Sequence, residues 1–183
     1  MKYFKTPTFL FDVFGEKQTV LEVSCTVLFA LLGSWMIYSV ADIRLDSWKA
    51  VVAYLLIADI LAGCIANFSV GTNAFYSKRP KNRLIFIAIH VHIIVVAWLL
   101  SEPIANALIV WGYTIMSAFL VNWLNGKVIQ TFIAANLMCY GIFLLIYLSL
   151  PMWFLMVSVF FMIKVVFSFS VNHFHAQNTE TSA

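Results

Sequence analysis

The fold is decided by a run of 36 uncharged residues from Val128 to Ile163, which reads VIQTFIAANLMCYGIFLLIYLSLPMWFLMVSVFFMI. As one helix, with a rise of about 1.5 Å per residue, this run would be about 54 Å long. The hydrocarbon core of a membrane is only about 30 Å thick, so the run predicts two antiparallel spans. Pro151 is the expected point of reversal, because proline has no backbone N–H with which to continue a helix. We therefore expect spans at 128–149 and 152–171.

In the rest of the chain, long apolar runs alternate with short charged segments. Of the 183 residues, 63% are hydrophobic and 10% are charged, a composition that cannot cover the surface of a soluble globule. A soluble enzyme is thus excluded, and we expect an all-α, multi-pass protein of the cell membrane with a single membrane domain over 1–183. The expected six spans are 23–41, 50–68, 84–100, 104–124, 128–149 and 152–171, followed by a polar tail at 172–183.

Basic residues are distributed unevenly between the segments that join the predicted spans. The segment 69–83 has four cations and no acid, and we expect it to be a loop. Its cations are Lys78, Arg79, Lys81 and Arg83. Because positively charged loops stay in the cytoplasm, six spans then place both termini inside. This orientation leaves only Arg44 and Lys49 outside.

Two of the predicted spans contain a charge near the middle, Asp59 in 50–68 and Lys164 in 152–171. Such a charge costs about 2.5–3.5 kcal/mol on membrane-insertion scales, whereas each Leu, Ile, Val or Phe offsets about 0.3–0.6 kcal/mol. Both spans have enough apolar residues to insert. Neither charge is neutral for insertion, however, so each needs a structural or a functional reason.

Four ionisable side chains are expected at one depth in the membrane. Counting along ideal helices from the outer ends of the spans places Asp59 about 15 Å deep and Lys164 about 20 Å deep. His90 and His92 lie about 18–21 Å from the same side. Asn67 shares the helix face of Asp59. This layer predicts a site for ligand binding or proton relay, formed by Asp59, Asn67, His90, His92 and Lys164.

The spacing of the histidines limits what this site can hold. His90 and His92 are two residues apart, so on a helix they point in nearly opposite directions, and we expect at most one of them to face the site. A haem would need axial histidines from two helices, and only His173, near the membrane interface, is available as the second. No haem or other cofactor is therefore expected. No metal is expected either, because the three cysteines lack the spacing of metal ligands.

Two functions of different classes remain open. In the first, the chain is a small proton- or cation-coupled transporter or permease, in which Asp59 binds the proton or cation, Lys164 neutralises Asp59 in one state, and His90 or His92 relays protons. In the second, the chain is a non-catalytic membrane subunit or a lipid-binding protein, and its polar residues only hold helices together. Asp59 and Lys164 would then form a structural pair, or Lys164 would extend to the inner headgroups. A membrane enzyme ranks third, because no nucleophile and base can be paired along the sequence.

The segment 69–83 also predicts what the protein contacts. Its cations fix the topology, and they would also attract anionic lipid headgroups. Hydroxyl and amide donors for a phosphate precede them, namely Ser69, Thr72, Asn73 and Tyr76. The lipid bilayer is therefore the expected partner, with a membrane-protein partner or a second copy of the chain as further candidates. Nucleic acid is not expected.

Overall fold

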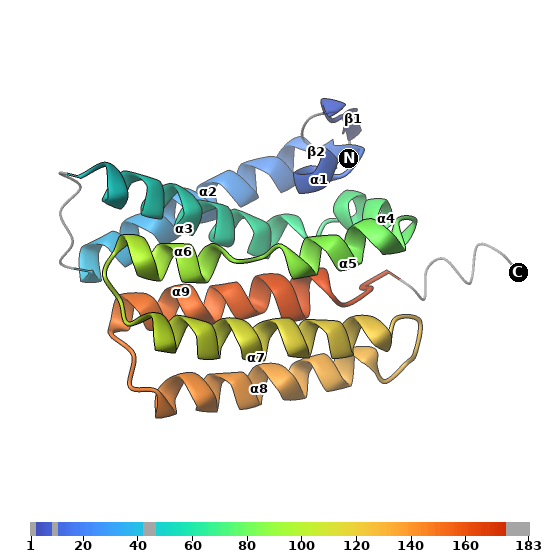
Figure 1. Ribbon diagram of the computed structural model, residues 1–183. Helices are drawn as coiled ribbons and strands as arrows, with labels where there is room; N and C mark the ends of the chain where they lie inside the picture. Colours follow the sequence, from blue (N-terminus) through green and yellow to red (C-terminus); the bar gives the residue numbers. More distant parts are fainter. Residues whose placement is uncertain (1–2, 9–10, 42–46, 175–183) are drawn as a thin grey trace, which may run out of the picture.

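The computed structural model describes residues 3–8, 11–41 and 47–174 (Figure 1). Along this part of the chain, six helical segments are long and apolar enough to cross a membrane. They are α2 (Val20–Val40), α3 (Trp48–Ala66), α5 (Pro80–Ala88) with α6 (His92–Leu99), α7 (Ile104–Trp123), α8 (Gln130–Tyr147), and α9 (Met152–Met162) with its continuation η2 (Ile163–Phe169). The protein is thus a multi-pass membrane protein whose spans are all helical, and each predicted span overlaps one of these segments.

The last span, α9 with η2, lies in the middle of the bundle (Figure 1). It is the most deeply buried of the six and packs against α2, α3, α6, α7 and α8. Phe154, Phe161 and Val165 are fully enclosed there. Large apolar side chains on the outside of the bundle, such as Leu55 on α3 and Phe143 on α8, are exposed. This pattern is the one that lipid favours, because hydrocarbon solvates these side chains.

The turns between spans follow the residues that permit them. Pro151 immediately precedes α9, where the chain reverses as predicted. Ser149 just before it has a φ of 50°, a left-handed conformation that tightens the reversal. Gly126, in the turn between α7 and α8, has a φ of 82°. Glycine adopts this angle without steric cost.

The segment 69–83 is not a loop, contrary to the prediction. It forms α4 (Val70–Ser77) and the first turn of α5. The Ser69 hydroxyl accepts a hydrogen bond from the Thr72 N–H and so caps α4. Pro80 begins α5, at the position in a helix where proline is favoured.

The residues before the first span form a small folded unit. Strands β1 (Tyr3–Lys5) and β2 (Lys17–Thr19) pair in an antiparallel sheet, and α1 (Phe11–Phe14) lies between them in sequence. Thr19 and Glu22 form a capping box, so α2 begins at Val20 rather than at Val23.

This unit, here called the N-terminal unit (residues 3–8 and 11–19), is closely docked on α4. A Cβ on Gly15 would overlap the backbone of Gly71, and a Cβ on Gly71 would overlap the carbonyl group of Lys17. The buried amide of Gln18 donates hydrogen bonds to the Phe14 carbonyl and, at 2.8 Å, to the Ser69 hydroxyl. Two glycines thus allow the backbones to meet, and a glutamine joins them.

The N-terminal unit, α4 and the α7–α8 turn lie at one end of the bundle (Figure 1). We call this end, which also carries Lys78 and Lys81, the basic end. The α6–α7 and α8–α9 turns lie at the opposite end. The cytoplasmic location of the basic end stays a prediction. Lys2, Arg44 and the predicted tail from His175 onward lie outside the described residues.

Candidate functional site

Asp59 on α3 and Lys164 on η2 form an ion pair between two spans. Lys164 Nζ donates to Asp59 Oδ2 at 2.7 Å and to the Asp59 carbonyl oxygen at 3.3 Å. The Lys164 side chain is only 4% exposed, whereas that of Asp59 is 47% exposed. Lys164 therefore points into the bundle rather than toward the headgroups. One side of the Asp59 side chain is not covered by the protein.

The close approach of α3 and η2 depends on small residues. A Cβ at Gly63, one turn after Asp59, would overlap the side chain of Lys164. One turn further along η2, the Ser168 hydroxyl donates to the carbonyl oxygen of Cys64 at 2.8 Å. Glycine at position 63 thus leaves the space in which Lys164 reaches Asp59.

Lys164 lies on a segment of unusual backbone geometry. η2 is a π-helix, in which the hydrogen bonds span one residue more than in an α-helix. Two side chains from other spans satisfy carbonyl groups at its end. Arg83 donates to the carbonyl oxygens of Phe169 at 3.1 Å and Ser170 at 2.5 Å, and Gln130 donates to that of Ser170 at 3.0 Å. Such wide turns recur at functional sites.

The third span is interrupted beside this ion pair. α5 ends at Ala88 and α6 begins at His92, and the connecting residues include His90, whose Nδ1 bonds to the carbonyl oxygen of Phe86. The prediction that at most one histidine faces the site is wrong, because it assumed an unbroken helix. The rings of His90 and His92 lie 5.2 Å apart, and both line the same cavity.

The cavity measures about 180 Å³ and is lined by all five residues predicted to share a site: Asp59, Asn67, His90, His92 and Lys164. Its other walls are Val13, Phe86 and Ile89. His92 Nε2 lies 3.9 Å from Asp59 Oδ2, while His90 is buried. The structure thus brings the five side chains together, and their role in binding or proton relay remains a prediction. We call this hollow the Asp59 cavity.

The Asp59 cavity extends from the middle of the span toward the basic end. Asn67 follows Asp59 by eight residues, about 12 Å along the helix axis. Val13 belongs to α1, which lies at the basic end. Asn67 Nδ2 and His92 Nδ1 are buried and have no hydrogen-bond partner among the described residues. Buried polar atoms usually form a hydrogen bond with protein, water or a ligand. These two nitrogen atoms can therefore form hydrogen bonds with a polar ligand in the cavity.

The four cations of the segment 69–83 do not act as one group. Arg83 is 2% exposed and holds the end of η2, so it is not available to lipid headgroups as predicted. Arg79 forms an ion pair with Glu16 at 2.8 Å. Lys78 and Lys81 are exposed. The sequence did not reveal the role of Arg83, because its carbonyl partners lie more than 80 residues away.

The predicted phosphate donors of this segment are used inside the protein. The hydroxyls of Ser69 and Thr72 lie 3.1 Å apart and both contact Gln18. Asn73 Nδ2 donates to the Val171 carbonyl oxygen at 3.2 Å. Tyr76 is buried. These side chains therefore attach α4 to its neighbours and are not directed at an external phosphate.

His173 is held close to η2. Its Nε2 lies 3.0 Å from the carbonyl oxygen of Phe167, and its ring centroid is 4.8 Å from that of Phe68. Burial lowers the pKa of His173 below its ordinary value. Within the described part of the chain, no group of three or more His, Cys, Asp or Glu residues is placed to hold a metal ion.

Comparison with known proteins adds no assignment. No protein-family model matches the chain, and neither does any curated protein or solved structure. The function is therefore inferred from the side chains of the cavity themselves.

Proposed function

We propose that the protein is a small proton- or cation-coupled transporter or permease, and that the Asp59 cavity is its coupling site. The observation that carries this proposal is the ion pair of Asp59 and Lys164 beside two histidines in one cavity, in the middle of a span. Ionisable side chains at this depth are expensive, and they are typical of ion and proton pathways. Histidine is the side chain whose ordinary titration range includes neutral pH.

Competition for the Asp59 carboxylate is the proposed coupling step. Lys164 Nζ bonds to Oδ2, the oxygen that also lies 3.9 Å from His92. A proton or cation arriving at this oxygen weakens the attraction for Lys164, because the carboxylate is then neutralised. Lys164 belongs to the central span, so its release acts on the element that contacts most of the bundle. Binding of a proton or cation to Asp59 and the ion pair of Asp59 with Lys164 thus exclude each other.

The backbone around the cavity supports movement at this point. α5 and α6 are separated by a short non-helical connection at the cavity wall, and η2 is a π-helix. Broken helices beside a midplane site are a recurrent design of secondary transporters, since the break lets two halves of a span move separately. The N-terminal unit adds Val13 to the wall nearest the basic end. Access from that end is the simplest path for a proton.

The proposal is tested by proton and sodium flux into proteoliposomes that contain a pH-sensitive or a sodium-sensitive dye. Flux is driven by a potassium diffusion potential, with and without a panel of small solutes inside the vesicles. We expect flux above that of empty vesicles for the parent protein, and flux at the level of empty vesicles for Asp59→Asn.

Glu102→Gln is the matched control. It makes the same change from carboxylate to amide at the α6–α7 turn, where Glu102 accepts a hydrogen bond from Asn106 at 3.2 Å and does not line the cavity. This variant keeps the parental flux if the cavity is the coupling site. Equal flux in the parent and in Asp59→Asn, or no flux with any solute, contradicts the proposal.

A further inference from the structure

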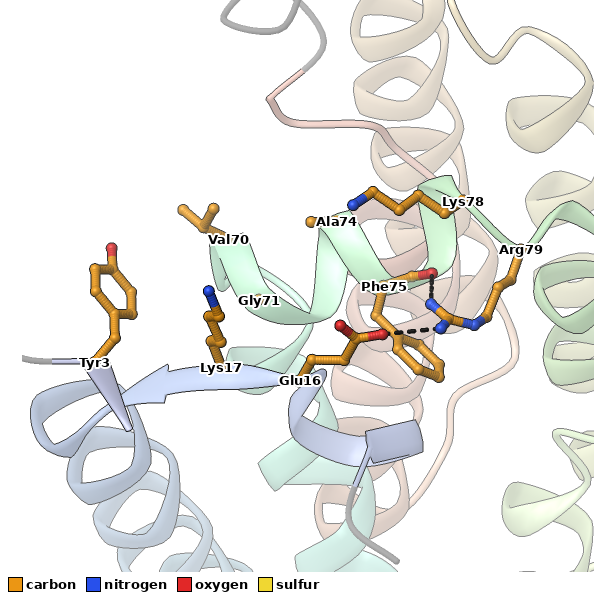
Figure 2. A pocket seen from close by; sticks show the side chains of 9 residues that line it. All are labelled: Tyr3, Glu16, Lys17, Val70, Gly71, Ala74, Phe75, Lys78 and Arg79. Carbon is orange, nitrogen blue, oxygen red and sulfur yellow. Dashed lines mark hydrogen bonds and ion pairs between the residues drawn. The ribbon is translucent and has the colours of Figure 1, made fainter. Parts of the chain in front are cut away.

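A second cavity, of about 410 Å³, lies at the basic end between β2 and α4 (Figure 2). No residue lines both this hollow and the Asp59 cavity. Figure 2 shows Lys17 rising from β2 toward α4 and Lys78 running back along α4 toward Ala74. Gly71 and Ala74 also line the cavity, and because neither carries a long side chain, they leave space between the two lysines.

The charges around this cavity are unequal. It is lined by three cations, Lys17, Lys78 and Arg79, and by one acid, Glu16. Glu16 is engaged with Arg79, and Arg79 also donates to the carbonyl oxygen of Phe75 at 3.0 Å. Within the described residues, the ammonium groups of Lys17 and Lys78 have no ion pair and no hydrogen bond. Two exposed positive charges therefore face one hollow without a counter-charge.

We propose that this cavity binds the phosphate of an anionic ligand, and that an anionic phospholipid such as phosphatidylglycerol supplies it. Lysine is a compact point charge that suits a phosphate oxygen, and the ion pair with Glu16 holds Arg79 in position beside it. The volume lies within the range of about 300–1,000 Å³ that is usual for small-ligand sites. The position at the end of the spans is the level at which lipid headgroups lie.

The walls agree with a headgroup better than with a bare ion. Val70, Ala74 and Phe75 give the cavity an apolar side, which suits glycerol carbons next to a phosphate. The cations that line this cavity are not the same as the four cations of the segment 69–83. Lys17 belongs to the site, whereas Lys81 does not line it and Arg83 is buried elsewhere.

The test is a lipid titration of the detergent-solubilised protein, with the thermal midpoint as readout. The added probes are short-chain phosphatidylglycerol, phosphatidylcholine of equal chain length, and glycerol 3-phosphate. A ligand that binds only the folded state raises the midpoint, and the rise with concentration gives an apparent affinity. We expect phosphatidylglycerol to raise the midpoint and phosphatidylcholine to leave it near its starting value.

Charge variants show where the lipid binds. Lys17→Gln and Lys78→Gln should each weaken the apparent affinity about fivefold, and Lys78→Arg should retain it. Lys81→Gln is the matched control, because it removes the same charge from the same segment outside the cavity. All three lysines are exposed, so the midpoint without lipid should not change.

Each outcome decides something about the site. Equal responses to the two phospholipids, or an equal loss in Lys81→Gln and Lys78→Gln, overturn the proposal in favour of diffuse surface charge. A response to glycerol 3-phosphate as large as that to phosphatidylglycerol supports the phosphate site and identifies a soluble ester as its ligand. The result is independent of whether the Asp59 cavity carries protons.

Discussion

Lys164 and Asp59 are buried to different degrees, and the difference predicts unequal effects of removing either side chain. Asp59→Asn leaves the enclosed ammonium group without its partner, which should cost about 3 kcal/mol of unfolding free energy. Lys164→Met replaces the lysine by an apolar chain of similar length and leaves a 47% exposed carboxylate on the wall of the Asp59 cavity, where water can solvate it, so we expect about 1 kcal/mol. The double variant should lie near the parent. Unfolding in lipid nanodiscs, analysed as a double-mutant cycle, measures the coupling.

The same cycle separates a transporter from a merely structural pair. If the pair only joins two spans, the double variant recovers both stability and any activity. If Asp59 carries the proton or cation, the double variant is stable but has no flux. Equal losses in the two single variants would contradict the burial difference on which this expectation depends.

At this scale the sequence revealed the charged residues better than their surroundings. Asp59 and Lys164 stood out because a charge within an apolar run is itself a signal. The orientation of His92 could not be predicted from the sequence, because neither glycine nor proline marks the break between α5 and α6. At this break a side chain takes over a freed backbone group, since the His90 ring bonds to the Phe86 carbonyl oxygen four residues earlier in the same span.

The docking of the N-terminal unit on α4 depends on one glycine contact. In Gly71→Ala the new methyl group meets the Lys17 carbonyl oxygen, so β2 must move away from α4. We expect a loss of about 1–3 kcal/mol, the usual effect of overpacking. Amide hydrogen exchange should show faster exchange at Thr6 and Gly15, whose N–H groups donate within the unit.

Gly112→Ala provides the comparison for this change. A Cβ at Gly112 on α7 meets no atom within 4 Å, so the same substitution is free of steric conflict. Alanine also favours a helix over glycine by about 0.5–1 kcal/mol. Stability equal to or above that of the parent is therefore expected. A loss as large as that of Gly71→Ala would mean that the contact with Lys17 is not the cause.

Whole elements were predictable where hydropathy alone determines them. Long apolar runs defined the six spans, because only such runs can lie in hydrocarbon, and the length of the 36-residue run with Pro151 divided it in two. The N-terminal unit, α4 and η2 were not foreseen. α4 depends on the capping of Ser69 and on contacts with distant residues such as Val171, and η2 is held by Arg83 and Gln130 from other spans.

The orientation of the whole bundle is open to direct measurement. In a cysteine-free background, Met152→Cys and Val128→Cys place a thiol at opposite ends of the bundle, both at exposed positions. The positive-inside rule predicts that a membrane-impermeant maleimide added to intact cells labels Met152→Cys and spares Val128→Cys. Val128→Cys should react only after permeabilisation.

Labelling of detergent-solubilised protein serves as the control, since both thiols should react there. The reverse pattern in intact cells would place the basic end outside. The phosphate site would then face the outer leaflet, and protons would enter the Asp59 cavity from outside the cell.

The central position of the last span has a consequence for biosynthesis. A ribosome makes α9 and η2 after the other five spans, yet these segments fill the middle of the bundle and supply Lys164. Asp59 therefore enters the membrane 105 residues ahead of its partner. Until α9 and η2 are made, the Asp59 carboxylate has no Lys164 to pair with, and the side chains that fill the middle of the bundle are missing.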